Sequence, residues 1–189
     1  PTRTYAELLE RMSPGDMHTH LYAKHIPLLG DDGTVQDFVR AARERGVLFD
    51  TGHGAGSFWF SIASPAMKQG FPPDSISTDL HKQSRLIPNA TMLPTMAKFL
   101  ALGMPLGEVI YRSTQKPAEM IRRPDLGTLA TGSEADVAVL GISSGDFGFV
   151  DSGGNRAAGS QRIRCEMTIR AGEVVWDLNG RSIKTRDVD

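Results

Sequence analysis

The sequence predicts an α/β fold for residues 1 to about 120, because short strand-like apolar stretches alternate there with segments of helical periodicity. The strand-like stretches cover residues 15–20, 47–53 and 75–79. Strands that alternate with helices of about ten residues are typical of βα units, which build a parallel sheet with helices outside it. From Gly127 onward, turns rich in Gly and Ser separate segments of alternating polarity, which predicts a small antiparallel β region.

The predicted helices have their own start and stop signals. Thr4 and Glu7 have the spacing of a capping box, which begins a helix that Pro14 and Gly15 end. Ser57 is the expected N-cap of a later helix that ends before the prolines after Gly70. Apolar residues at helical spacing predict further helices over residues 35–45, 92–100 and 106–110.

The tail is expected to contain short strands joined by tight turns. Alternating patterns predict strands over residues 137–140, 147–150, 163–169 and 174–176. Residues 151–155 combine Asp, Ser, Gly and Asn, and no helix signal follows them. This segment is therefore interpreted as a hairpin turn rather than a phosphate-binding loop.

Composition excludes several classes of partner. The chain has 189 residues, of which 40% are hydrophobic and 23% charged, and its formal net charge is -1. This balance is ordinary for a soluble globular protein and disfavours nucleic acid and anionic membranes as partners. Cys165 is the only cysteine, so no intramolecular disulfide can form, and no apolar run reaches the roughly 18 residues that span a bilayer. We therefore expect a soluble, cytoplasmic protein.

Three residues at the predicted strand ends could bind a metal ion. The carboxyl ends of parallel strands open on one face of a sheet, and His20, His53 and Asp79 lie there. Histidine nitrogen and aspartate oxygen bind Zn²⁺ at about 2.0 to 2.2 Å, and an open coordination position lowers the pKa of a water to about 7. Gly52 and Gly54 would let the backbone bend around His53. Taken singly, each histidine could be a satisfied polar residue, and Asp79 could end an Asx-turn or cap a helix.

Other side chains near these strand ends have two interpretations each. His18 and His20 form an H-x-H pair, which a strand would place on one face, where it could chelate one ion. Tyr22 could line an apolar substrate pocket or simply pack. His25 and His81 follow strand ends, where they could contact substrate or be solvated. We take His18, Tyr22 and His81 as candidate substrate-binding residues.

Four segments together resemble the second half of the amidohydrolase superfamily. They are residues 15–20, 44–54, 76–81 and 125–140, and the closest subgroup is that of the dihydroorotase-like deacetylases, metal-dependent hydrolases of amides and esters. The resemblance implies that residues 1–122 are the carboxy-terminal half of a (β/α)₈ barrel, strands five to eight. Residues 123–189 would then form a small antiparallel β-sandwich segment.

The resemblance also implies residue roles. His20 matches the metal ligand of strand five, His53 that of strand six, and Asp79 the strand-eight aspartate that orients and deprotonates the attacking water. Residues 17–21 imitate the H-x-H motif of strand one, but the order of the segments that follow favours strand five, and His18 is then additional. The whole enzyme would hold one or two zinc ions. It would hydrolyse an amide, cyclic amide or ester bond of a small molecule through metal-bound hydroxide.

Length predicts that the barrel is incomplete. A full barrel of this kind needs about 250 residues, and half of one leaves two open sheet edges. We therefore expect a homo-oligomer or pairing with the missing half-barrel. The alternative to a fragment of an enzyme is a catalytically inactive half-barrel that acts only in folding or assembly.

Overall fold

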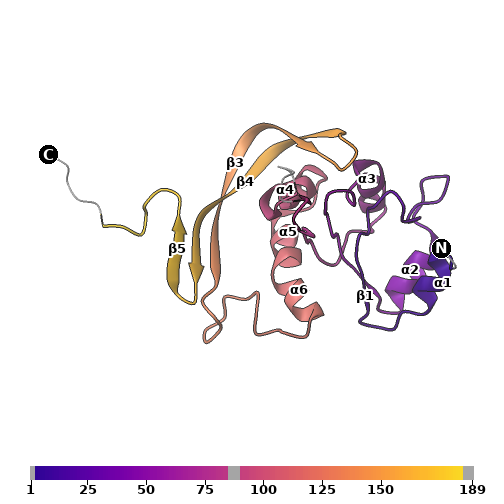
Figure 1. Cartoon of the computed structure of the whole chain (residues 1–189), viewed down its shortest axis with the longest axis horizontal. Coiled ribbons are helices and arrows are strands. Elements are labelled where there is room, and N and C mark those ends of the chain that lie inside the picture. The colour runs from indigo at the N-terminus through magenta and orange to yellow at the C-terminus, as the bar shows by residue number, and fades with distance from the viewer. Residues whose placement is uncertain (1–2, 85–89, 185–189) are drawn as a thin grey trace.

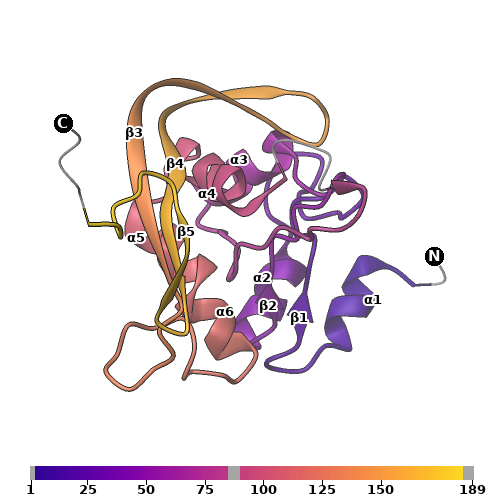
Figure 2. The same cartoon turned by 60° about the vertical axis from the view of Figure 1, so that its left-hand side comes forward.

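The structure is a computed structural model that describes residues 3–84 and 90–184. In chain order its helices and strands are α1 (Tyr5–Glu10), β1 (Met17–His18), α2 (Asp37–Glu44), β2 (Leu48–Phe49), α3 (Phe60–Lys68), α4 (Met92–Ala101), α5 (Leu106–Ser113), α6 (Gln115–Met120), β3 (Val137–Val150), β4 (Arg156–Arg170) and β5 (Glu173–Asp177). A long curved hairpin, β3–β4, arches from the side of α5 over α4 toward α3 (Figures 1 and 2). The predicted combination of an α/β part with an antiparallel sheet is confirmed.

The strand-like stretches of the α/β part lie parallel, as predicted. Met17 pairs with Leu48 in the β1–β2 ladder, and Asp50 forms a parallel bridge with Ser75. Beyond that bridge, the backbone N–H of His53 donates to Ser77 O at 3.1 Å, so the two segments of the chain continue side by side. The carboxyl ends of all three stretches therefore meet at one edge.

Of the four expected strands, five to eight, the described α/β part contains two, β1 and β2, and residues 75–79 add an isolated parallel bridge. Since Asp50 pairs directly with Ser75, no strand separates β2 from residues 75–79, and the connection between them is α3. Consecutive strands of a (β/α)₈ barrel are neighbours. If residues 75–79 are counted as strand eight, β2 is strand seven and β1 is strand six.

The antiparallel sheet has the order β3-β4-β5. The predicted turn at residues 151–155 is confirmed, because Asp151 N–H donates to Asn155 O at 3.0 Å between β3 and β4. The strands expected at 137–140 and 147–150 are instead one strand, β3, in which shifts of register near Leu140 and Phe147 absorb the irregular residues. The described residues of the tail form this single sheet, whereas a sandwich requires a second one.

Two helix boundaries correct the expectations from sequence. The N-cap of α3 is Trp59 rather than Ser57, whose N–H donates to His53 O at 3.1 Å within the preceding turn. Helix α6 was not expected. Thr114, with φ −135° and ψ −82°, interrupts the helical conformation between α5 and α6. The capping box of Thr4 and Glu7 is present as predicted.

The core lies between the helices, the strand ends and the hairpin β3–β4. Its largest buried aromatic side chains come from the α/β part, and Phe149 and Ile163 of the antiparallel sheet join them. These aromatics are Tyr22, Phe49, Phe58, Phe71 and Phe99. The core therefore ties the sheet to the α/β part at one end.

Within the described residues, no helix has both the length and the apolar character required to cross a bilayer.

Candidate active site at the strand ends

Asp50 ties the three strand ends together, although the sequence analysis did not single it out. Its carboxylate accepts hydrogen bonds from Thr19 Oγ1 at 2.7 Å, from Ser77 Oγ at 2.7 Å and from Ser75 Oγ. Asp50 is 5% exposed, so these hydroxyls replace the water that the carboxylate loses on burial. The available signal was an acidic residue directly after the apolar residues 47–49.

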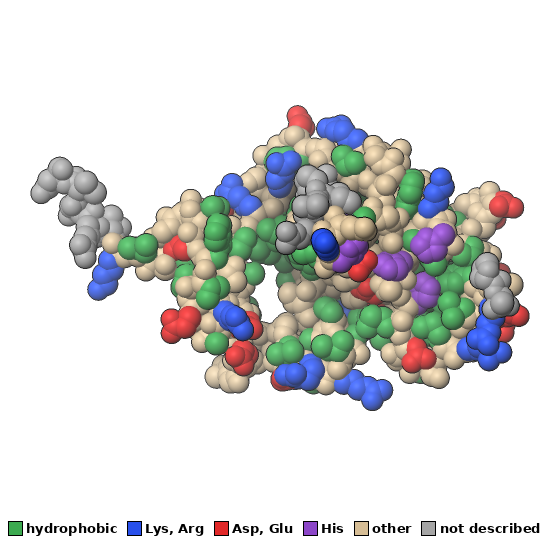
Figure 3. All heavy atoms as spheres, in the orientation of Figure 1, with side chains coloured by type: hydrophobic (Ala, Val, Ile, Leu, Met, Phe, Trp, Pro, Cys, Tyr) green, Lys and Arg blue, Asp and Glu red, His purple; other side chains and the backbone are tan. Residues whose placement is uncertain are grey.

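His20 and Asp79 face each other where two of these segments end. His20 Nε2 lies 3.9 Å from Asp79 Oδ2, and the two side chains are 32% and 45% exposed. Both residues have left-handed backbone, with φ of 65° and 44°, a conformation that is uncommon outside glycine and is often found at functional sites. Figure 3 shows histidine side chains gathered beside acidic ones on this face.

The ring of His20 is oriented by its other nitrogen. Nδ1 lies 2.7 Å from Gly52 O, and because a carbonyl can only accept, Nδ1 carries the hydrogen. In the neutral ring, Nε2 then has a free lone pair on the side of Asp79. Histidines that bind metals commonly donate their second nitrogen to a carbonyl or carboxylate in this way.

Two glycines leave room for this pair, as the sequence predicted for the backbone around His53. Gly52 and Gly54 both have φ of 48°, which favours glycine. A Cβ on Gly52 would lie 2.7 Å from His20 Nδ1, and a Cβ on Gly54 would lie 2.7 Å from Asp79 Oδ2. Any side chain at either position would displace the His20–Asp79 pair.

His53 is turned away from the surface and into the core. It is 3% exposed, and its ring stacks on Phe58 with the centroids 5.0 Å apart and the planes 6° apart. Nδ1 donates to Gly54 O at 2.8 Å, and Nε2 lies 2.6 Å from Lys98 Nζ. Burial, and then the charge of Lys98, lower the pKa of His53 to about 4. The ring is therefore neutral at pH 7 and accepts a hydrogen bond from the ammonium group.

Lys98 is a site residue that the sequence analysis missed. It lies on α4 between the buried residues Ala97 and Phe99, and its own residue exposure is 0%. Burial lowers the pKa of Lys98 to about 8, while the charge of Asp151 raises it, so the ammonium form predominates at pH 7. The only signal was a lysine within the apolar part of a predicted helix.

The three predicted metal ligands are consequently not assembled around one point. His20 faces Asp79, but the available nitrogen of His53 faces Lys98. Over residues 3–84 and 90–184, no group of three His, Cys, Asp or Glu side chains is arranged to hold a metal ion.

The candidate substrate-binding residues lie in different surroundings. The ring of His18 packs against Tyr5, with the centroids 5.2 Å apart, and burial lowers the pKa of His18. Strand β1 ends at His18, so the left-handed His20 does not continue a strand face with it. Tyr22 is completely buried, and its hydroxyl donates to Phe71 O at 3.2 Å.

His81 is exposed in the loop after Asp79. Its backbone N–H donates to Ser84 Oγ at 2.8 Å, and its Nδ1 accepts from the N–H of Gln83 at 3.3 Å. Of the three candidates, His81 is the one that an arriving molecule could reach beside Asp79. His18 and Tyr22 contribute to packing in this arrangement.

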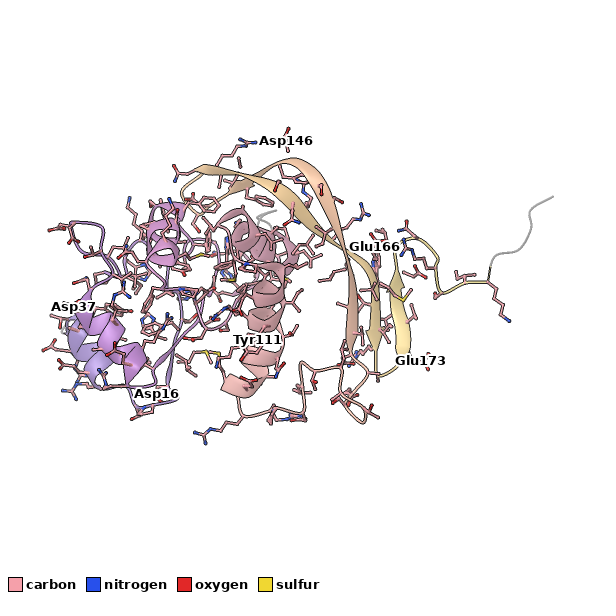
Figure 4. All side chains as sticks on the ribbon, turned by 180° about the vertical axis from the view of Figure 1, so that it is seen from behind. Asp16, Asp37, Tyr111, Asp146, Glu166 and Glu173 are labelled. Carbon is pink, nitrogen blue, oxygen red and sulfur yellow. The ribbon has the colours of Figure 1, made fainter. Side chains whose placement is uncertain are left out.

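An apolar groove lies elsewhere on the molecule. Its volume is about 640 Å³, and it lies between α4, α5 and β3, with Met96, Tyr111 and Leu140 among its lining residues. Figure 4 labels Tyr111 on α5 and shows the hairpin strands beside that helix. None of the predicted site residues lines this groove, so the candidate active site is the strand-end cluster.

Known proteins resemble this chain over most of its length. A deacetylase of Brucella anthropi is 34% identical over 156 residues, which are 82% of this chain and 39% of the relative. A crystal structure of an adenine deaminase superposes with a TM-score of 0.88 and 32% identity, over 94% of this chain and 48% of that one. The chain belongs to the amidohydrolase superfamily. The resemblance stated from the sequence is thus confirmed.

A second solved structure supports the assignment and also matches over less than half of its own length. A dihydroorotase structure superposes with a TM-score of 0.77 and 31% identity, over 92% of this chain and 48% of that one. No protein-family model matches the chain. The part of this amidohydrolase chain that matches spans less than half the length of each of these relatives.

The donor chemistry at His20 and Asp79 fits a zinc ion. Imidazole nitrogen and carboxylate oxygen are typical zinc ligands, and the Nδ1–H of His20 is already held by Gly52 O. Two ligands fix a catalytic ion poorly, since catalytic zinc sites commonly have three from the protein. The two residue types therefore suit zinc, but the described residues supply one ligand fewer here than catalytic zinc sites commonly have.

Proposed function

We propose that this chain is the carboxy-terminal part of a metal-dependent amidohydrolase, with residues 1–122 belonging to its barrel. The intact enzyme would hydrolyse an amide, cyclic amide or ester bond of a small molecule. The observation that carries the proposal is the His20–Asp79 pair, 3.9 Å apart and accessible at the carboxyl ends of parallel strands. Active sites of βα barrels lie at that end.

The two residues have separate roles in this proposal. His20 would bind a divalent ion, most simply zinc, through Nε2, and the ion would supply a Lewis acid that lowers the pKa of a coordinated water. Asp79 would take the proton from the attacking water and pass it to the leaving group. Its partial exposure, 45%, leaves it accessible to both. His81 would contact the substrate from the adjoining loop.

Further ligands would come from protein outside the described site. The matched residues make up only 39% of the Brucella anthropi deacetylase and 48% of the adenine deaminase, and β1 pairs only with β2 in the described residues, which leaves an open edge. We propose that the missing half of the barrel, or a second copy of this chain, covers that edge. Sedimentation velocity tests this: a stable monomer, unchanged by adding the remaining part of such an enzyme, would contradict it.

The experiment that tests the function compares Asp79→Asn with a matched control, Asp31→Asn. Asp31 is exposed and lies in a loop after Gly30. Purified protein would be analysed for zinc and assayed with amide and ester substrates, alone and with the remaining half. We expect Asp79→Asn to lower metal-dependent hydrolysis by a factor of roughly 10² or more, since general acid–base catalysis contributes about 10² to 10⁴. Asp31→Asn should leave it unchanged.

The alternative function is that of an inactive module for folding or assembly. It is favoured by one observation, that the described residues lack a group of three ligands around one point. Protein that carries no zinc and hydrolyses nothing, even with the remaining half present, would support this alternative and contradict the enzyme.

A further inference from the structure

We infer that His53 is a positioning residue rather than a metal ligand, and that Lys98 holds it in that role. In this inference, which rests on the proposed function of Asp79, the Lys98–His53 pair fixes the turn at Gly54. The turn then holds the position of the backbone before Asp79, and so the position of the Asp79 carboxylate.

The first step concerns the nitrogens of His53. Nδ1 donates to Gly54 O at 2.8 Å, and Nε2 accepts from Lys98 Nζ at 2.6 Å. A metal ion would need the lone pair that Lys98 already uses, because Nδ1 carries the hydrogen. A hydrogen bond from an ammonium group is stronger than one between neutral groups. Both ring nitrogens are thus engaged inside the protein.

The second step concerns the connection to Asp79. The backbone N–H groups of His53 and Gly54 donate to the carbonyls of residues 77 and 78, at 3.1 and 2.9 Å. Gly54 also lies so close to Asp79 that a Cβ would come within 2.7 Å of Oδ2. Because Nδ1 of His53 is bound to Gly54 O, the ring, the turn and the chain before Asp79 form one hydrogen-bonded unit.

The third step concerns what fixes Lys98. Its Nζ lies 5.6 Å from the centroid of the Phe58 ring, on which His53 also stacks. Asp151, in the β3–β4 turn, provides the negative charge that favours the ammonium form. The Asp151 carboxylate is itself held by the N–H of Phe60 at 3.0 Å. Three elements, the hairpin tip, α4 and the β2 end, therefore meet at this pair.

The experiment follows the ring nitrogens of the histidines by ¹⁵N NMR in the whole chain, with zinc as the added metal. We expect zinc to shift the Nε2 signal of His20 and to leave that of His53 in place. A zinc-dependent shift of His53 Nε2 into the range of a metal-bound nitrogen would overturn the inference. This measurement needs no variant, so it holds even if a substitution at Lys98 prevents folding.

A second arm tests positioning in the zinc-free protein. Lys98→Met, which removes the donor, should shift the Nε2 signal of His53 and the carboxyl ¹³C signal of Asp79, whereas Lys98→Arg should largely restore both. Lys82→Met, at an exposed lysine of the loop after Asp79, is the matched control for the lost charge. Equal effects of Lys98→Met and Lys82→Met on Asp79 would overturn the inference.

The two arms separate this inference from the proposed function. Zinc that shifts neither His20 nor His53, even with the remaining half of the barrel added, would contradict the proposed metal site, and the Lys98→Met comparison would then decide the inference. Zinc that shifts both histidines would support the metal site and overturn the inference.

Discussion

The two ends of the antiparallel sheet are held very differently. At the β3–β4 turn, Ser152 exchanges hydrogen bonds with the backbone of Phe58, at 2.9 and 3.1 Å, and Gly153 lies so close to Trp59 that a side chain would not fit. At the other end, β5 pairs with β4 alone among the residues that the structure describes, and Trp176 is 54% exposed. The sheet is therefore part of the core at its turn and a nearly separate arm at β5.

This difference implies that substitutions near the turn and the strand ends are costly, whereas those on β5 are not. The buried side includes the pairs that position the candidate site. The exposed side carries apolar residues that are about half exposed, among them Val174, Val175 and Trp176. The predictions below test the contrast, beginning with the largest effect.

Phe58→Ala should destabilise the chain most. The Phe58 ring is fully buried and packs against Tyr22 and Phe99, with centroids 5.8 and 5.6 Å apart, as well as stacking on His53. Truncating a buried phenylalanine costs about 3 to 5 kcal/mol of the free energy of unfolding. Urea unfolding followed by circular dichroism measures it. Phe58→Leu should cost clearly less, and equal costs would show that ring packing does not hold the turn.

Asp50→Ala should cost about 3 kcal/mol, because it removes an acceptor of three hydroxyl hydrogen bonds and leaves buried donors unsatisfied. The same unfolding measurement applies. Asp50→Asn should cost less, since its amide oxygen still accepts, and Asp31→Ala should have no measurable effect. A cost for Asp50→Ala as small as that for Asp31→Ala would show that the strand ends are held by backbone pairing alone.

Stability should fall as pH is lowered from 6.5 toward 4. The pKa of His53 is lowered to about 4 in the folded chain by burial and by Lys98, although the charge of Asp151 acts in the opposite direction. Between these pH values the unfolded chain takes up a proton that the folded chain does not, so the stabilisation present above pH 6.5 is lost as pH falls. The full loss is about 3 kcal/mol for such a shift.

His53→Gln should flatten this pH dependence, and His25→Gln, at an exposed histidine, should leave it unchanged. Unfolding free energies at pH 7, 6, 5 and 4 measure both slopes. Equal slopes for the original chain and His53→Gln would assign the pH dependence to other groups, such as His18, whose pKa burial also lowers.

The sequence predicted those features that depend on local pattern. The alternation of residues 15–79 gave the parallel arrangement, and the composition of residues 151–155 gave the hairpin turn. The positions of His20 and Asp79 at strand ends predicted their proximity, which the structure confirms at 3.9 Å.

The features that the sequence did not predict depend on contacts between distant residues. Asp50 binds Thr19 and Ser77, which lie 31 and 27 positions away, and Lys98 binds His53 across 45 positions. A lysine in an apolar helix or an aspartate after a strand has many possible partners, and spacing does not select one. The direction of the His53 ring is likewise decided by Phe58 and Lys98 rather than by its glycine neighbours.

Trp176→Ser should have the smallest effect on the isolated chain, within about 0.5 kcal/mol, since substitutions at exposed positions rarely cost more. Thr168, its partner across the β4–β5 ladder, would keep its backbone pairing. The free energy of unfolding should be measured with and without the remaining part of such an enzyme, to compare the isolated chain with the complex. If that part covers β5, the cost of Trp176→Ser should rise only in its presence, because burial of an indole then adds to the stability of the complex. A cost of several kcal/mol in the isolated chain would instead show that β5 is already packed.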